Sequence, residues 1–275
     1  MNKLIVVNKP VFVSSNSYLK KIKWKHKNKK AGFSGTLDPF ACGCLIVAFG
    51  QYPKLFRYLK KTPKTYRTTI WLDVLSNSLD IENIEHQPKN KELNESDIKR
   101  KLSTLVGELD YLPPKYSAKK IDGKRAYDLA RAGEDFEMKR ITSTVYDVKF
   151  INYNHPFISF DITVSEGSYI RSMAQILLDR LDAIGTLSYL KRLNEGEFFF
   201  DDEKELNPLE YLDLKTNNYT GTKEWFDLGK KLNIDYFETK EDGEYLITFD
   251  TFFAVIEIKD MEVKYVLNKV LLNDN

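Results

Sequence analysis

The chain has 275 residues, 42% of them hydrophobic, and its 42 basic and 40 acidic side chains leave a formal net charge of +2. This length and apolar content can bury the core of one large domain, alone or with a small appendage. The near-neutral charge excludes a uniformly basic surface, and no stretch approaches the ~18 consecutive apolar residues of a membrane-spanning helix.

Strands and helices are predicted to alternate from the start of the chain. The apolar run Leu4 to Val7 predicts a strand, which Asn8-Lys9-Pro10 ends. The serines within residues 14–17 can cap a helix that runs toward Trp24. Residues 45–49, Leu-Ile-Val-Ala-Phe, are predicted to form a buried strand or its beginning.

The next elements show one strand, one polar loop and one helix. Residues 66–74 alternate and contain β-branched and aromatic side chains, which predicts a strand. Residues 82–95 are polar and contain proline, so a loop is expected there. A helix is predicted from Ser96, because one helical face collects four apolar side chains, those of Ile98, Leu102, Leu105 and Val106.

The pattern continues as α+β up to about residue 200. Pro113-Pro114 predicts an extended segment, and residues 127–132 fit a short helix. Residues 144–150 and 157–164 alternate like two paired strands. Apolar residues recur at helical spacing over 169–181, which predicts a longer helix.

A domain boundary is predicted within residues 203–224, where charged residues, proline, asparagine and glycine cluster. After it, residues 245–249, 253–258 and 262–267 alternate between apolar and polar side chains. These stretches predict a small C-terminal β module.

The cysteines and histidines give no sign of a metal site. Cys42 and Cys44 are too close in sequence for an unstrained disulfide, and the three histidines are scattered without zinc-ligand spacing. The apolar run near the N-terminus is too short for a signal peptide. We therefore expect reduced thiols, a cytoplasmic protein and no bound metal.

Basic residues are concentrated just before residue 31. A local basic strip can bind phosphate groups even when the whole protein is near neutral, and a solvated lysine-rich surface is the alternative. The strip consists of Lys20, Lys21, Lys23, Lys25, Lys27, Lys29 and Lys30.

The loop that follows the strip holds a single carboxylate. Glycines and a proline surround Asp38 in Gly35-Thr36-Leu37-Asp38-Pro39, a composition that makes a tightly turning loop. A carboxylate on such a loop against a buried strand is well placed for chemistry. It can equally cap nearby backbone N–H groups as an Asx-turn.

Further distinctive blocks follow the Asp38 loop. They are Lys64-Thr65-Tyr66, residues 113–120 (PPKYSAKK) with 123–133, residues 167–172 (GSYIRS) and residues 187–192 (LSYLKR). Together these blocks resemble the motifs of the TruB family, the tRNA pseudouridine-55 synthases, in that family's order and over roughly residues 1–200. The last block resembles a closing helical segment of the family, which predicts a helix there.

The resemblance implies a catalytic trio of Asp38, Tyr66 and Arg171. Such enzymes break the glycosidic bond between C1′ and N1 of a uridine, turn the base and rejoin it through C5, without redox chemistry and without a cofactor. A carboxylate suits the role of nucleophile or electrostatic stabiliser, and Asp38 matches it. Arg171 is expected to keep Asp38 ionised through a two-point clamp. Tyr66 is expected to stack on the target base and to take part in proton transfer.

The resemblance also implies residues that bind the substrate. Tyr169 and Leu190 match positions around the flipped nucleotide, and Lys64 is a candidate phosphate contact. Lys9 matches a lysine whose motif supports the catalytic loop. Phe33 stands where the family usually has a histidine that contacts RNA, so a polar role there is lost or moved.

Two further blocks depart from the family pattern. Val11-Phe12-Val13 lacks the glycine that follows the Lys-Pro motif, and residues 76–80 (SNSLD) keep only Asp80 of two acids. These departures bear on RNA contacts rather than on the reaction class.

The expected fold is α+β, the pseudouridine synthase fold, with a large mixed and mostly antiparallel sheet flanked by helices and loops. Residues 1–205 are predicted to form the catalytic domain and 223–275 the small β module. The resemblance implies a reduced RNA-binding domain of the PUA type for that module, with a plain structural cap as the alternative.

The expected function is isomerisation of uridine 55 in the T-arm of tRNA, by a monomer that needs no protein partner, no membrane and no cofactor. Two alternatives stay open. One is a non-catalytic tRNA-binding or tRNA-folding chaperone, and the other is a pseudouridine synthase that acts on another RNA.

Overall fold

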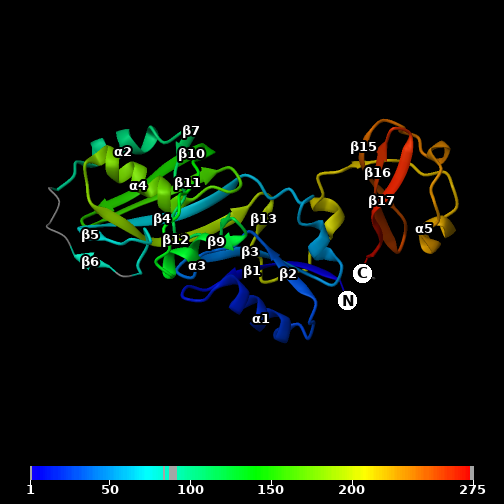
Figure 1. Cartoon of the computed structure of the whole chain (residues 1–275), viewed down its shortest axis with the longest axis horizontal. Coiled ribbons are helices and arrows are strands. Elements are labelled where there is room, and N and C mark those ends of the chain that lie inside the picture. The colour runs from blue at the N-terminus through cyan, green and yellow to red at the C-terminus, as the bar shows by residue number, and fades with distance from the viewer. Residues whose placement is uncertain (1, 83, 87–91, 273–275) are drawn as a thin grey trace.

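The computed structural model describes residues 2–82, 84–86 and 92–272. One large mixed sheet dominates it, and its strands follow the order β1-β3-β12-β4-β11-β10-β7 (Figure 1). β2 pairs with β3, and β13 pairs with β12, so the described sheet has nine strands. Their bounds are β1 (Lys3–Lys9), β2 (Ala31–Ser34), β3 (Cys42–Phe49), β4 (Lys64–Leu72), β7 (Gly107–Tyr111), β10 (Ile141–Asn154), β11 (Phe157–Val164), β12 (Gly185–Glu195) and β13 (Phe198–Phe199).

The sheet is antiparallel throughout except where β12 runs parallel to β3. Two short ribbons accompany it: β5 (Val74–Leu75) with β6 (Glu85–His86), and β8 (Lys120–Ile121) with β9 (Lys124–Arg125). The large, mostly antiparallel sheet predicted from the sequence is therefore confirmed. The predicted loop over 82–95 contains β6, and its residues 83 and 87–91 lie outside the described part of the chain.

Five α-helices and three single-turn 3₁₀ helices surround the sheets in the described residues. The helices are α1 (Ser15–Lys25), α2 (Glu95–Ser103), α3 (Ala126–Arg131), α4 (Ile170–Leu181) and α5 (Glu224–Leu228), and the 3₁₀ turns are η1 (Tyr52–Leu55), η2 (Pro208–Tyr211) and η3 (Ile234–Tyr236). None of the described helices combines the length and the apolar character that crossing a bilayer requires.

Helices α2 and α4 lie together on one face of the sheet (Figure 1). Ile98 and Leu102 of α2 and Met173 and Leu177 of α4 are buried in one cluster with side chains of β4 and β11. The predicted helical face of α2 is right except at its end, because the helix stops at Ser103 and Val106 is half exposed.

β1 and β3 are buried on both faces because alternate side chains meet different partners. Ile5, Leu45 and Val47 contact α1 through Leu19 and Ile22. The intervening residues Leu4, Val6, Cys44 and Ile46 belong to another buried cluster, which also contains Phe253 and Val255 of the C-terminal sheet. This double burial accounts for the uninterrupted apolar run of residues 45–49.

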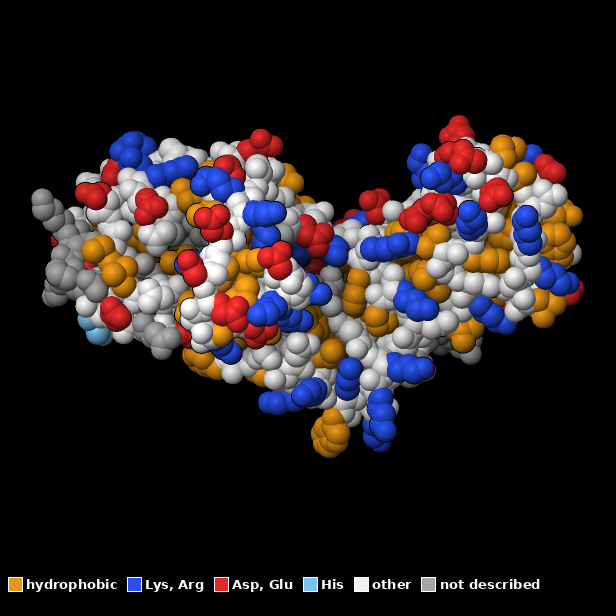
Figure 2. All heavy atoms as spheres, viewed as in Figure 1, with side chains coloured by type: hydrophobic (Ala, Val, Ile, Leu, Met, Phe, Trp, Pro, Cys, Tyr) orange, Lys and Arg blue, Asp and Glu red, His pale blue; other side chains and the backbone are white. Residues whose placement is uncertain are grey.

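The C-terminal residues form the predicted small β module, seen beyond the large sheet in Figure 1, and Figure 2 shows a notch between the two parts. Its strands are β14 (Lys215–Thr216), β15 (Gly243–Thr248), β16 (Phe252–Lys259) and β17 (Glu262–Leu271). β14 lies upstream of residue 223, where the module is predicted to begin. The division of the chain into domains stays a prediction.

Residues 187–192, expected from the resemblance to be helical, belong to strand β12, and that expectation is wrong. β12 lies between β3 and β4 and pairs with both. A segment held between two strands has its backbone groups bonded on both edges, which a helix could not provide. The structural reason is therefore the position of the segment at the centre of the sheet.

Candidate active site

A cavity of about 250 Å³ opens where the Asp38 loop, β4, β12 and the start of α4 meet. Six of the residues predicted for the site line it, although they come from distant parts of the chain. These are Asp38, Lys64, Tyr66, Tyr169, Arg171 and Leu190. Gly35, Glu166 and Arg192 also contribute to its wall.

The loop that carries Asp38 is held from several sides. Ser15, the first residue of α1, accepts a hydrogen bond from the Leu37 N–H through its Oγ and donates one to the Leu37 carbonyl, both at 3.0 Å. Arg192 Nη2 donates to the Gly35 carbonyl at 2.8 Å. Gly35 has φ +65°, and a Cβ there would lie 2.9 Å from Glu195 Oε1, so this position requires glycine. The Asp38 carboxylate is therefore presented on a fixed support.

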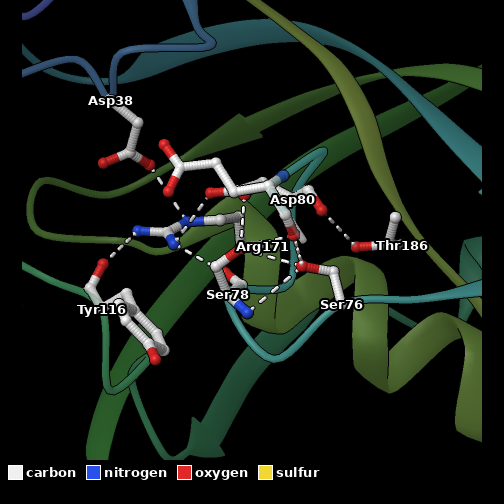
Figure 3. Close-up of polar contacts among 8 residues, drawn as sticks. Asp38, Ser76, Ser78, Asp80, Tyr116, Arg171 and Thr186 are labelled. Atoms are coloured by element: carbon white, nitrogen blue, oxygen red, sulfur yellow. Dashed lines mark hydrogen bonds and ion pairs between the residues drawn. The ribbon is translucent and has the colours of Figure 1, made fainter. Parts of the chain in front are cut away.

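Arg171 makes the predicted ion pair with Asp38 (Figure 3). Its Nε lies 3.0 Å from Asp38 Oδ2; the Arg171 side chain is 3% exposed, whereas that of Asp38 is 34% exposed toward the pocket. The expected two-point clamp is not formed, because the other guanidinium nitrogens have different partners. Nη1 donates to the Ser78 carbonyl at 2.7 Å, and Nη2 donates to the Tyr116 carbonyl at 2.8 Å.

Asp80 is a second carboxylate on the same guanidinium (Figure 3). Its Oδ2 lies 3.3 Å from Arg171 Nη1, and its Oδ1 accepts from Ser78 Oγ at 2.5 Å and from the Glu82 N–H at 3.0 Å. Sequence reasoning noted Asp80 only as a remaining acid. The signal in the sequence is the mainly polar stretch over 76–80, from which the Ser78 carbonyl and the Asp80 carboxylate contact Arg171.

The charges around Asp38 act in opposite directions. Burial raises the pKa of Asp38 above its ordinary value, the Arg171 guanidinium lowers it, Asp80 raises it and Lys9 lowers it, and the net direction is upward. A neighbouring positive charge is therefore required if the carboxylate is to be ionised in the pocket near neutral pH.

A cluster of buried charges lies under Tyr66. Glu195 is fully buried and contacts Lys64 Nζ at 3.2 Å and Arg192 Nη2 at 3.1 Å. Burial on its own lowers the pKa of Arg192, but Tyr66 and Glu195 beside it raise that pKa above its ordinary value. Lys64 is thus engaged by a buried carboxylate rather than free for phosphate. Arg192 and Glu195 were not predicted as site residues.

Tyr169 and Leu190 complete the apolar part of the wall. Tyr169 precedes the first residue of α4, and its N–H donates to the Tyr111 hydroxyl at 3.0 Å. Burial raises the pKa of the Tyr169 phenol, which keeps it protonated. Leu190 is buried on β12. An aromatic ring and an aliphatic side chain facing a carboxylate can hold a flat ring.

Lys9 and Phe33 do not line the cavity. Lys9 is fully buried, and its Nζ donates to the carbonyls of Pro10 at 2.9 Å, Val13 at 2.6 Å and Pro39 at 3.4 Å. Its burial lowers the pKa of the ammonium to about 8. Lys9 therefore supports the Asp38 loop from behind. Phe33 is partly buried and packs against the cluster formed by β1, β3 and α1.

Comparison with known proteins finds similar chains and a matching family model. The family model described as "TruB family pseudouridylate synthase (N terminal domain)" matches residues 23–170. A protein of a Sulfurovum species named "tRNA pseudouridine synthase B" is 53% identical over 270 residues, covering 98% of each chain. One of the same name from Campylobacter jejuni is 47% identical and covers 98% of this chain and 99% of that relative.

Solved structures share the fold at much lower identity. The chain described as "Crystal structure of the archaeal box H/ACA sRNP Nop10-Cbf5 complex" aligns with a TM-score of 0.66 and 17% identity, over 98% of this chain and 86% of that chain. A second, "Structure of H/ACA RNP bound to a substrate RNA containing 2'-deoxyuridine", gives a TM-score of 0.64 and 16% identity, over 98% and 85%. At this identity the likeness concerns the fold alone.

Proposed function

The chain belongs to the TruB family of pseudouridylate synthases, and from that premise we propose that it isomerises uridine 55 in the T-arm of tRNA to pseudouridine. The observation that carries the proposal is the Asp38 carboxylate, which faces a nucleotide-sized cavity and contacts the buried Arg171 at 3.0 Å. The relatives that cover almost the whole chain supply the reaction class and tRNA as the substrate.

In the proposed reaction the C1′–N1 bond of the target uridine breaks and a C1′–C5 bond forms. N1 gains a proton and C5 loses one, so no oxidant, reductant or second substrate is consumed. Asp38 acts as nucleophile or electrostatic stabiliser, and Arg171 keeps it ionised. Tyr66 stacks on the base, and its hydroxyl is the group assigned to the proton transfer.

The site also sets a requirement on the RNA. A base inside a folded T-arm cannot reach Asp38, so the nucleotide must be extruded into the cavity at a cost of a few kcal/mol. Tyr169 and Leu190 then contact the extruded nucleotide. Phosphate contacts on a basic face and stacking of the displaced base offset the cost.

Four further points belong to the proposal. The enzyme acts in the cytoplasm, in keeping with its two free cysteines, and as a monomer without a protein partner. Residues 1–205 form the catalytic domain. Residues 223–275 form a module that contacts RNA in the manner of a reduced PUA domain. Light scattering on the purified protein tests whether it is a monomer. The tRNA affinity of variants with substitutions on β15 to β17 tests whether the module contacts RNA.

The proposal is tested by incubating the purified protein with unmodified tRNA transcript and mapping pseudouridine by position. Wild-type protein is expected to modify position 55 alone, and a transcript with cytidine at 55 should stay unmodified. Asp38→Asn serves as the matched inactive control. Absence of pseudouridine with wild-type protein at saturating tRNA would refute the proposed function, and modification at another position would refute the assignment of uridine 55.

A further inference from the structure

The outward face of α1 presents an unusual surface. Trp24 is 86% exposed, the highest value among the large exposed hydrophobic side chains of the described residues. At 100° per residue, Ser17, Lys20 and Lys21 share its face, opposite the buried Ser15, Leu19 and Ile22. Figure 2 shows Lys and Arg side chains gathered at this edge of the molecule, around a protruding hydrophobic group.

Nothing in the described part of the chain covers or neutralises this face. Among the lysines of α1, Lys25 forms an ion pair, with its Nζ 2.7 Å from Glu203 Oε2. Lys20 and Lys21 are exposed and make no ion pair among the described residues. An isolated indole on a helix with a mean hydropathy well below zero gives no continuous apolar stripe, so the face suits neither a hydrophobic groove nor insertion into a lipid bilayer.

We propose that this face binds the substrate tRNA, with Lys20 and Lys21 contacting neighbouring phosphates and Trp24 stacking on an unpaired base. This rests on the proposed function, since tRNA is the partner that it supplies. The charge of the two lysines complements the phosphate backbone. A flat indole flanked by cations is the arrangement by which proteins bind single-stranded nucleotides.

The position of α1 relative to the cavity fits such a contact. Ser15 at the start of α1 is bonded to Leu37, the neighbour of Asp38, so the helix is fixed to the catalytic loop. Trp24 lies nine residues further along, which is about 14 Å at the rise of an α-helix. At its other end, Lys25 and His26 contact Glu203 at 2.7 and 3.1 Å, so both ends of the helix have contacts to other segments. The proposed contact therefore lies on the helix that supports the Asp38 loop, about 14 Å along α1 from Ser15.

The lysine part is tested by the salt dependence of tRNA binding. Each lost phosphate contact lowers the slope of log K against log salt by about 0.7–0.9. The double substitution Lys20→Ala/Lys21→Ala is expected to lower the slope by about 1.4–1.8. Lys99→Ala/Lys101→Ala, on α2 at another edge of the molecule, is the matched control and should leave it unchanged. An unchanged slope for the α1 variant, or an equal loss in the α2 variant, would overturn the assignment.

The stacking part is tested with Trp24→Ala and Trp24→Phe. Loss of one stacked base predicts about a 5-fold or greater loss of tRNA affinity for Trp24→Ala. Trp24→Phe keeps an aromatic face and should recover most of it. In turnover the effect falls on KM rather than on kcat, because the cavity is untouched. Equal affinity of Trp24→Ala and wild type would refute stacking.

Fluorescence separates this inference from the proposed function. A Trp71→Phe/Trp225→Phe variant leaves Trp24 as the only tryptophan, because the chain has three. Bound tRNA is expected to quench this signal and to shield it from acrylamide, while a fully paired duplex of the same length should not. If the protein forms pseudouridine but Trp24 stays as accessible in the complex as in the free protein, the inference fails and the function stands. If tRNA shields Trp24 but no pseudouridine forms, the tRNA contact at α1 stands and the proposed function fails.

Discussion

The ion pair between Arg171 and Asp38 makes a quantitative prediction about pH. Two unit charges about 4 Å apart attract by about 4 kcal/mol at an effective dielectric constant near 20. Asp38 exposes a third of its side chain, and screening by solvent reduces this to about 2 kcal/mol. Removing the guanidinium should therefore shift the balance between ionised and protonated Asp38 about 30-fold toward the protonated form.

The sign of the effect follows from the burial of Asp38. Burial raises the pKa of this carboxyl, and Arg171 opposes the rise. In Arg171→Ala the pKa should rise further, so loss of ionisation should lower activity near neutral pH by up to about 30-fold, with partial recovery as the pH increases. Arg171→Lys keeps the charge but loses the planar contacts, so its activity near neutral pH should lie between those of Arg171→Ala and wild type.

Single-turnover rates measured across the pH range on the three proteins test this reasoning. Asp80→Asn is expected to act in the opposite direction, because Asp80 raises the pKa of Asp38. The acid limb of the pH–rate profile of this variant should move to lower pH. Arg180→Ala, in the last turn of α4 and outside the lining of the cavity, is the control for changes in the helix. Arg171 also binds two backbone carbonyls, so a melting curve must show that each variant is folded. Profiles of identical shape for Arg171→Ala and wild type would mean that Arg171 only positions the substrate.

The remaining predictions concern the catalytic groups and one glycine. Asp38→Asn should abolish turnover and leave the Kd for tRNA within a few-fold in a filter-binding assay, because phosphates and stacked bases supply most of the affinity; substantial product would contradict its role. Tyr66→Phe keeps the stacking face, and if its hydroxyl moves a proton the single-turnover rate should fall ~10²-fold. A rate equal to wild type would leave stacking as its role. Gly43→Ala should lower the free energy of unfolding by more than the ~1–2 kcal/mol of a left-handed residue, since φ is +102° and the new Cβ would lie 2.2 Å from the Arg192 carbonyl. An unchanged denaturant midpoint would exclude that clash.

The pattern of apolar residues predicted the strands well where a strand is buried on both faces or alternates regularly between a buried and a more exposed face. The uninterrupted run at 45–49 marks a strand whose odd and even side chains both meet apolar partners, α1 on one side and the C-terminal sheet on the other. The alternation over 157–164 likewise marks β11, which pairs with β10 and β4. In both places the local pattern and the tertiary environment agree.

The failures have tertiary causes. Residues 187–192 contain leucine, tyrosine and basic side chains, which allow a helix, but their place between β3 and β4 makes them a strand. Glu195 and Arg192 look like surface charges in sequence, and only the folded sheet shows them paired and buried. The resemblance to a family brought Asp38, Tyr66 and Arg171 forward, because residues that distant cannot be joined by spacing alone. It could not show that Arg171 divides its donors between two carboxylates.

The buried charges beneath Tyr66 have a consequence for how the chain assembles. Lys64 and Glu195 face each other across β4 and β12, and Arg192 of the same strand reaches Glu195 as well. If β12 slid by one residue during folding, Glu195 would turn to the other face together with Arg192, and Lys64 of β4 would lose the carboxylate opposite it. An unpaired buried charge costs about 3–5 kcal/mol, a large part of the stability of a typical protein. The pairing of Lys64 with Glu195 therefore favours the native register of β12 against β4 over a slipped one.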